Sequence, residues 1–221
     1  MKTEIKGGKA FSYVDIELAP GETITTESDA MSSMAADLDL TAQLNGGFVK
    51  GILRKFLGGE TLFISQFSNN TDGPRALTVV QPTPGEIKCV EMTGDMLYLQ
   101  PGAFLACSEG VKVGLAWAGF TSLIAREGLF RMVVSGEGQV WYGAYGALIE
   151  KEIDGEYIID TSHLVAYEPT VKLKLQLAGG IFSSFFGGEG LVTRVEGKGK
   201  VVIQSRSISG LAGWINPKFF W

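Results

Sequence analysis

The stretch Gly58-Gly59-Glu60-Thr61-Leu62-Phe63 decides how the chain is organised, because versions of it return twice. The later versions are Glu127-Gly128-Leu129-Phe130 and Gly187-Gly188-Glu189-Gly190-Leu191-Val192. Glu60, Glu127 and Glu189 are 67 and 62 residues apart, a period that is longer than that of the common solenoid repeats. We therefore expect one β-rich unit to occur three times, with equivalent structural roles for Glu60, Glu127, Glu189, Gly59 and Gly188.

A second marker recurs with nearly the same spacing. The turn Pro20-Gly21-Glu22 is followed by Pro84-Gly85-Glu86 and Asp154-Gly155-Glu156, at steps of 64 and 70 residues. After each of these turns we expect a strand and then a corner of small residues. The three corners are Ser28-Asp29-Ala30-Met31, Pro101-Gly102-Ala103-Phe104 and Thr161-Ser162-His163-Leu164.

Each unit continues with a segment in which apolar residues alternate with other residues, as in a strand with one face on the core. The apolar positions are Leu38, Leu40 and Ala42, then Val111, Val113 and Leu115, then Val171, Leu173 and Leu175. Glycine turns then predict a closing hairpin in each unit. These turns are Asp72-Gly73, Gly136-Glu137-Gly138 and Gly197-Lys198-Gly199.

The pattern predicts an all-β protein of three pseudo-repeats of antiparallel strands, covering residues 10–81, 82–147 and 148–209, with a C-terminal aromatic tail at 210–221. None of the units has enough core to stand alone, so we expect them to pack around a shared centre with approximate threefold symmetry. Residues 1–221 are then one domain with a double-stranded β-helix or sandwich-like body.

Composition excludes several classes of function. The chain has 24 acidic and 19 basic residues, a net charge of −5 and no block of like charges, which argues against nucleic-acid binding. No apolar run is long enough to span a bilayer, and residues 1–19 lack the apolar core of a secretory signal. Cys89 and Cys107 are therefore expected to be reduced, buried thiols of a cytoplasmic protein, with a disulfide between them as the alternative.

Four runs in the sequence resemble the altered inheritance of mitochondria 24 family. They are Pro101-Gly102-Ala103-Phe104-Leu105-Ala106, Ala144-Tyr145-Gly146-Ala147-Leu148-Ile149-Glu150, Asp160-Thr161-Ser162-His163-Leu164-Val165-Ala166 and Ser207-Ile208-Ser209-Gly210-Leu211-Ala212-Gly213-Trp214. The resemblance spans nearly the whole chain and implies a fold related to the trp RNA-binding attenuation protein, with three structural repeats. It implies no catalytic residues and no cofactor. Eukaryotic members of the family are tied to the mitochondrial inner membrane, whereas a short form like this one is expected in the cytoplasm.

The residues that could carry chemistry have structural interpretations beside the chemical ones. His163 is the only histidine, so a site with several histidines around a metal ion is excluded, and a Ser-His-Asp arrangement would rest on this residue with Asp160 and Ser162. We expect a structural histidine at a strand corner instead. Glutamates that recur in every unit are expected to accept backbone N–H groups or to pair across interfaces; they are Glu22, Glu86 and Glu156, besides Glu60, Glu127 and Glu189.

The apolar connectors between the strands are the features that point most directly to function. The residues concerned are Phe48, Ile52 and Phe56, then Trp117 and Phe120, then Phe182, Phe185 and Phe186. They could plug the body, form an interface with a second copy or another protein, or touch a membrane surface, and the C-terminal Trp214 and Trp221 could join them.

The sequence as a whole predicts a non-enzymatic scaffold or binding protein that acts through these apolar surfaces. A homo-oligomer or a protein partner is expected, with peripheral membrane contact as a further mode. The rival hypothesis is a small-ligand binder or hydrolase-like enzyme with a pocket near His163, Cys107 and the recurring glutamates.

Overall fold

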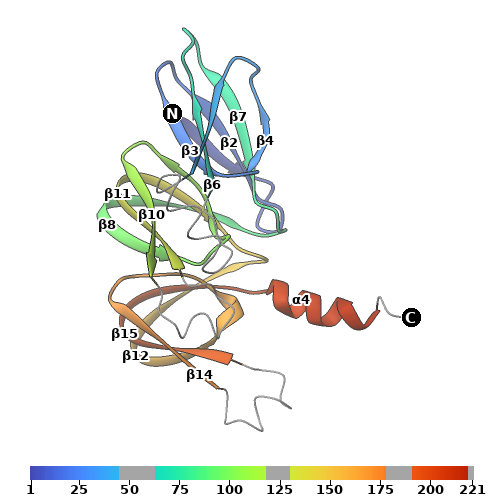
Figure 1. Ribbon diagram of the computed structural model, residues 1–221, viewed down its shortest axis with the longest axis vertical. Helices are drawn as coiled ribbons and strands as arrows, with labels where there is room; N and C mark the ends of the chain where they lie inside the picture. Colours follow the sequence, from blue (N-terminus) through green and yellow to red (C-terminus); the bar gives the residue numbers. More distant parts are fainter. Residues whose placement is uncertain (45–62, 118–129, 178–190, 219–221) are drawn as a thin grey trace.

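The structure, a computed structural model, describes residues 1–44, 63–117, 130–177 and 191–218. Within these ranges the chain is mostly antiparallel strand, with one α-helix near the C-terminus (Figure 1). The all-β prediction is therefore confirmed. In the described ranges, no helix is long and apolar enough to cross a bilayer.

The first group of strands holds two short antiparallel systems. Strand β2 pairs with β7 and β1, and β7 also pairs with β4. Strand β6 pairs with both β3 and β5. The bounds are β1 Lys2–Lys6, β2 Tyr13–Leu18, β3 Thr23–Glu27, β4 Met31–Met34, β5 Asp39–Leu44, β6 Phe63–Ser68 and β7 Arg75–Val80.

The second and third groups are each organised by one long strand. Strand β11 pairs with β8, β9 and β10, and β15 pairs with β12, β13 and β14. The bounds are β8 Ile87–Leu99, β9 Phe104–Ser108, β10 Val111–Trp117, β11 Phe130–Gly143, β12 Leu148–Asp160, β13 Leu164–Tyr167, β14 Val171–Leu177 and β15 Leu191–Gln204. The groups are joined by β3–β9 and β8–β13 pairing, which makes one 11-stranded sheet beside a 4-stranded one.

The predicted closing hairpins are wrong. Strand β11 continues through Gly136 and Gly138 without reversing its direction. The φ angles of these glycines are +112° and +132°, and both halves of β11 pair with the same strand, β8. Strand β15 passes through Gly197 in the same way. In the first group, β6 and β7 lie in different sheets. Glycine with positive φ serves a bend or bulge as well as a reversal, so the turn signal was ambiguous.

Two further expectations need correction. Asp154-Gly155-Glu156 is not a turn before a strand, because β12 runs through it from Leu148 to Asp160, whereas Pro84-Gly85-Glu86 does precede β8 and the corner at Pro101 as predicted. The bend in β8 is at Gly94, whose φ is +96°. Leu40, expected on the core face, is 47% exposed, because β5 pairs only with β6 at the end of the sheet. The other strands with alternating apolar residues form as predicted, as β10 and β14.

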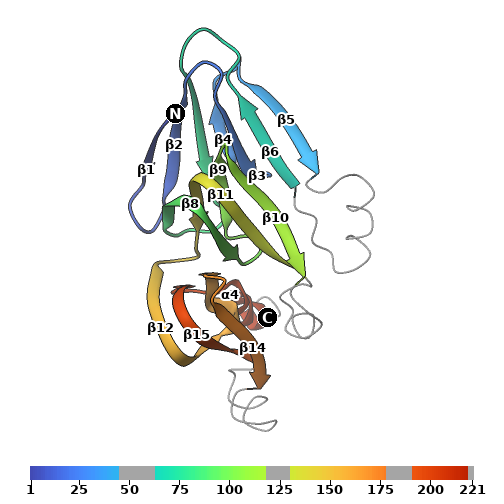
Figure 2. The ribbon, with the colours of Figure 1, turned by 90° about the vertical axis from the view of Figure 1, so that its left-hand side faces the viewer.

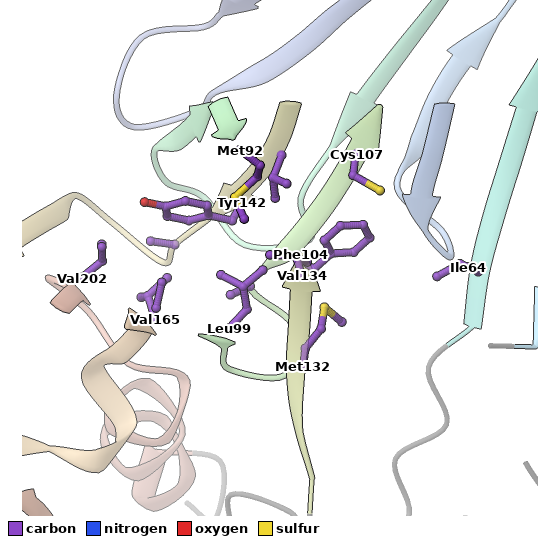
Figure 3. Packing of buried hydrophobic residues seen from close by; sticks show 14 residues of the cluster. Ile64, Met92, Leu99, Phe104, Cys107, Met132, Val134, Tyr142, Val165 and Val202 are labelled. Carbon is purple, nitrogen blue, oxygen red and sulfur yellow. The ribbon is translucent and has the colours of Figure 1, made fainter. Parts of the chain in front are cut away.

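A central core cluster joins the three groups. It contains Ile64 from the first group, residues such as Phe104 and Val134 from the second, and Val165 and Val202 from the third (Figure 3). A second cluster joins the first group to the second, with Val14 from β2 and Trp141 from β11, and a third cluster fills the third group around Tyr167 and Val195. The links between the groups are therefore held by shared burial as well as by strand pairing.

The links between the groups also bond to one another. The N–H of Ser12 donates to the carbonyl of Gly85 (3.0 Å), and residues 84–86 pair in parallel with 144–146 through the Gly85–Gly146 bridge. Residues 145–147 in turn accept the N–H groups of Ser205 (3.0 Å) and Arg206 (3.2 Å). We call this chain of contacts, from Ser12 through 84–86 and 144–147 to 205–206, the linker ladder.

Beyond the ladder the chain enters α4 (Ile208–Ile215) and the short η2 (Asn216–Lys218). Figure 1 shows the three strand groups one after another along the long axis, with α4 projecting from the group of β12, β14 and β15. Figure 2 shows the same helix nearly end-on beside β12 and β15. The sequence pattern predicted an aromatic tail at residues 210–221 and did not predict this helix.

Candidate functional site

A cleft of about 560 Å³ lies where the ladder ends and α4 begins. Its walls come from the link after β11, the 3-10 helix η1 (Thr161–His163), the end of β15 and the first two turns of α4. The lining residues are Tyr145, His163, Ser205, Arg206, Ser207, Gly210, Leu211 and Trp214. Three of the four runs that carry the family resemblance thus meet at one place, although they are far apart in the sequence.

The side chain of Gln204 holds the walls of the cleft together. Its Oε1 accepts the N–H of Tyr145 (2.9 Å), and its Nε2 donates to the carbonyl of Ser162 (2.9 Å). The neighbouring Ser205 Oγ accepts the N–H of Ala147 (2.9 Å). These bonds tie segments about 40 to 60 residues apart to the end of β15, so the cleft has a fixed polar floor.

His163 presents its ring in one orientation. Its Nδ1 lies 2.6 Å from the carbonyl oxygen of Gln204, and a carbonyl only accepts, so Nδ1 carries the proton. The other nitrogen, Nε2, is left for a ligand. Asp160 does not orient this ring, because its Oδ1 accepts both the N–H and the Oγ–H of Ser162. The three residues are therefore not arranged as a catalytic triad.

Arg206 stands at the side of the cleft. Its aliphatic stem packs over Gly146, whose φ is +82°, and a Cβ added to Gly146 would lie 3.0 Å from the Arg206 Cγ. Within the described part of the chain the guanidinium makes no hydrogen bond or ion pair. The nearest atom to such a Cβ is Ser205 Oγ, so a glycine is required here by Ser205 and by the positive φ, and the exposed Arg206 lies beside it.

Helix α4 exposes its apolar side chains to solvent. Ser207 caps it by accepting the N–H of Gly210 (3.1 Å), and none of its residues is buried. Ile208 is 61% and Trp214 63% exposed, and Leu211 is exposed as well. The ammonium of Lys218 lies 4.2 Å from the centre of the Trp214 ring. The helix therefore carries an uncovered apolar surface bordered by cations.

The recurring glutamates have structural partners, as predicted for the three that the structure describes. Glu22 accepts the N–H of Ala19 (2.7 Å) and pairs with the N-terminal ammonium, which lowers its pKa. Glu86 accepts the N–H of Leu148 (2.9 Å), and Glu156 pairs with Arg194 (3.0 Å). None of these three side chains lines the cleft described above.

The cysteines lie away from the cleft. Cys107 is buried and Cys89 is half-buried, and both are free thiols. Burial raises the pKa of Cys107 to about 12 and that of Cys89 to about 11, so neither thiol is a ready nucleophile. The rival hypothesis of a pocket shared by His163, Cys107 and the glutamates therefore holds for His163 alone.

Most of the predicted interaction residues lie outside the described side chains. These are Phe48, Ile52, Phe56, Trp117, Phe120, Phe182, Phe185 and Phe186, together with Glu60, Glu127, Glu189, Gly59 and Gly188. The sequence interpretation also missed Tyr145, Gln204 and Arg206. Tyr145 lies inside a run quoted for the resemblance, and Gln204 and Arg206 directly precede another, which is the signal that could have found them.

Comparison with known proteins places the chain among bacterial relatives. A family model described as mitochondrial biogenesis AIM24 matches residues 3–206. An uncharacterised protein of Streptococcus pyogenes serotype M6 is 29% identical over 227 residues, covering 96% of this chain and 89% of the relative. A crystal structure of a Streptococcus pyogenes protein superimposes with a TM-score of 0.81 at 28% identity, covering 98% of this chain and 99% of that one.

Proposed function

The chain belongs to the mitochondrial biogenesis AIM24 family, and from this premise we propose that it is a non-enzymatic binding protein that attaches to an anionic membrane surface through α4. The observation that carries the proposal is an eight-residue helix without a buried residue. Isolated helices shorter than about 12 residues are marginal in water. A helix that is apolar on nearly every side is normally covered, so α4 requires a surface to enter.

Charge favours a lipid surface as that cover. Residues 197–221 contain Lys198, Lys200, Arg206 and Lys218 and no acidic residue, in a chain whose net charge is −5. Lys198 and Lys200 pair with acidic residues of β12, which leaves Arg206 and Lys218 on the two sides of α4. Basic residues next to an anionic bilayer contribute about 1 kcal/mol each, and tryptophan is enriched at the headgroup level.

The expected attachment is weak and reversible. Ile208, Leu211 and Trp214 are 61%, 40% and 63% exposed, so burying the exposed part of each contributes a fraction of the roughly 1.5 to 3 kcal/mol gained by a fully exposed side chain. Lost translational freedom and side-chain ordering offset a large part of that gain. The predicted connectors, which lie outside the described residues, could add to this surface, and their part in binding stays a prediction.

Vesicle flotation tests the proposal. The wild type should float with vesicles of phosphatidylglycerol and phosphatidylcholine, and much less with phosphatidylcholine alone. The double variant Ile208→Ser/Trp214→Ser should stay at the bottom of the gradient. Phe11→Ser is the matched control, because Phe11 is 71% exposed in the first strand group, far along the chain from α4. Equal flotation of the wild type and the double variant contradicts attachment through α4.

A second copy of the chain is the competing cover for α4, and light scattering coupled to size exclusion separates the two. A dimer that the double variant converts to a monomer, with no flotation of the wild type, would assign α4 to a homo-oligomer. A monomeric wild type that floats supports the membrane.

Binding is favoured over catalysis because polar groups near the cleft are already engaged in hydrogen bonds within the protein. Asp160 is engaged by Ser162, and His163 Nδ1 is engaged by the backbone. The groups that remain open at the cleft are the guanidinium of Arg206, which suits an anion, and Nε2 of His163, which accepts a hydrogen bond. No acid–base pair is formed by the described lining residues.

We also propose that the three strand groups are pseudo-repeats of one module with approximate threefold symmetry, in a double-stranded β-helix like that of the trp RNA-binding attenuation protein. The support is that one pairing pattern occurs twice. Strand β11 pairs with the three strands before it in the sequence, and β15 pairs with the three strands before it. A crystal structure tests it: the rotation that superimposes β8–β11 on β12–β15 should be near a third of a turn. A rotation far from that value contradicts the symmetry.

A further inference from the structure

We propose that the cleft between β15 and α4 is a binding site for a small amphiphilic anion. A carboxylate or phosphate head would lie against the guanidinium of Arg206, and an apolar body against Leu211 and Trp214. Leu211 and Trp214 cannot contact the amphiphile and a bilayer at once, so the monomeric amphiphile would fill the cleft in the unattached protein, and this site goes beyond membrane attachment.

The charge of the lining selects an anion. Arg206 is the only Lys or Arg among the described lining residues, which include no Asp or Glu. Its guanidinium has no partner in the described part of the chain, and its stem lies beside Gly146. A guanidinium offers parallel N–H donors that match a carboxylate or phosphate in a two-bond arrangement.

The histidine adds a second polar contact in a fixed place. Because Nδ1 donates to the carbonyl of Gln204, the ring cannot rotate freely, and Nε2 of the neutral ring is an acceptor, which can bond a head group that carries an O–H, such as a singly ionised phosphate monoester. Gln204 itself is anchored by Tyr145 and Ser162. The polar side of the cleft is thus assembled before a ligand arrives, which reduces the entropy lost on binding.

The remaining wall determines that the ligand has an apolar part. Leu211 and Trp214 come from α4, while the polar groups come from the end of β15 and from η1. A volume of about 560 Å³ is within the range of small-molecule sites, and it exceeds what a bare inorganic anion fills. A head group and a short alkyl chain fit this division into polar and apolar sides.

Isothermal titration calorimetry with monomeric octyl phosphate and octanoate, below their micelle concentrations, tests the site. Octyl phosphate or octanoate should bind at least tenfold more tightly than octyltrimethylammonium or inorganic phosphate. Arg206→Gln should weaken binding about tenfold or more, and Trp214→Ser several-fold. Lys112→Gln is the matched control, since Lys112 is an exposed lysine of β10 outside the lining, and it should bind like the wild type.

Several results would overturn the proposal. Equal affinity for octyltrimethylammonium would mean that only the apolar wall binds, and equal affinity for inorganic phosphate would mean that the apolar wall does nothing. Unchanged binding by Arg206→Gln, in a variant whose thermal unfolding matches the wild type, removes the anion contact. No heat with any probe removes the site.

The membrane proposal fails separately. Binding of octyl phosphate without flotation on vesicles keeps the cleft and rejects attachment of α4 to the bilayer. Flotation without binding of the monomers does the reverse and identifies the headgroup layer, rather than the cleft, as the anionic partner.

Discussion

The corner before β9 and the corner before β13 occupy corresponding places, yet one is sealed and the other is open. Each follows a strand of 13 residues and precedes a strand that pairs with the last long strand of its group. Ala103, in the first corner, is buried, and its carbonyl accepts the N–H of Gly143 (2.8 Å). His163, in the second, is half-buried and lines the cleft.

The linker ladder explains the difference. After β11 the chain continues through residues 144–147 into the next group, which adds another strand system beside the corner. After β15 no further group follows within the described chain, and Arg206 and α4 leave the body. The proposed binding site therefore lies where the ladder ends, because in the described chain no strand group follows that corner to cover it.

Breaking the ladder should have the largest effect on stability. A Cβ on Gly85 would overlap the carbonyl oxygen of Ala144, so Gly85→Ala must push the two links apart. We expect a loss of about 4 kcal/mol in the free energy of unfolding, measured by urea denaturation. Gly102→Ala is the control: its φ is +77° with nothing within 4 Å, so it should cost about 1 kcal/mol. Equal losses in the two variants would show that the substitution of a glycine in itself, and not the contact between the links, causes the loss in Gly85→Ala.

Exchanging the residues at the two corners tests whether one is sealed and the other open. Ala103→His places an imidazole in a packed space and should cost about 3 kcal/mol. His163→Ala removes one hydrogen bond at a half-buried position and should cost about 1 kcal/mol. Thermal and urea unfolding of both variants and the wild type measure the two losses of stability. A larger loss for His163→Ala than for Ala103→His would reverse the interpretation.

The corner of the first strand group, at Ser28-Asp29-Ala30-Met31, should show its burial through the pH dependence of stability. Glu27, directly before the corner at Ser28-Asp29-Ala30, has a pKa raised from 4.5 to about 7 by burial and, secondarily, by the charge of Asp29. The folded state keeps this proton between pH 4.5 and 7 while the unfolded state loses it, so stability should fall across that window as pH rises, by on the order of 2 kcal/mol. Urea titrations of Glu27→Gln should give a flatter curve, and an equally steep one would place the effect on another group.

The smallest effect is expected at the open corner itself. Arg206 has no partner among the described residues, so Arg206→Gln should change the free energy of unfolding by less than about 0.5 kcal/mol. A clear loss of stability in urea would mean that Arg206 is a structural residue and that its effect on ligand binding cannot be interpreted alone.

The sequence contained enough to predict the strands but not their partners. Alternation at Val111, Val113 and Leu115 and at Val171 and Leu173 predicted β10 and β14 correctly, because period two follows from the geometry of one strand. The corners were also found. The hairpins failed because a glycine at positive φ allows either a reversal or a bent strand, and long-range pairing decides between them.

The candidate site was predicted only in part for a related reason. His163 was visible as the sole histidine, but its contact with Gln204 spans 41 residues and that of Gln204 with Tyr145 spans 59. Such contacts depend on the tertiary arrangement and leave no local pattern. Trp214 was noted as a candidate for an interface, but Ile208 was not, and only the fold reveals that both are exposed on one helix.

Hydrogen–deuterium exchange of the whole chain, with and without anionic vesicles, tests most directly whether the open end of the ladder is the binding surface. We predict that vesicles slow exchange in residues 205–218 and leave the strands β2 to β11 unchanged. Unchanged exchange in residues 205–218, with protection elsewhere on the chain, would contradict the account.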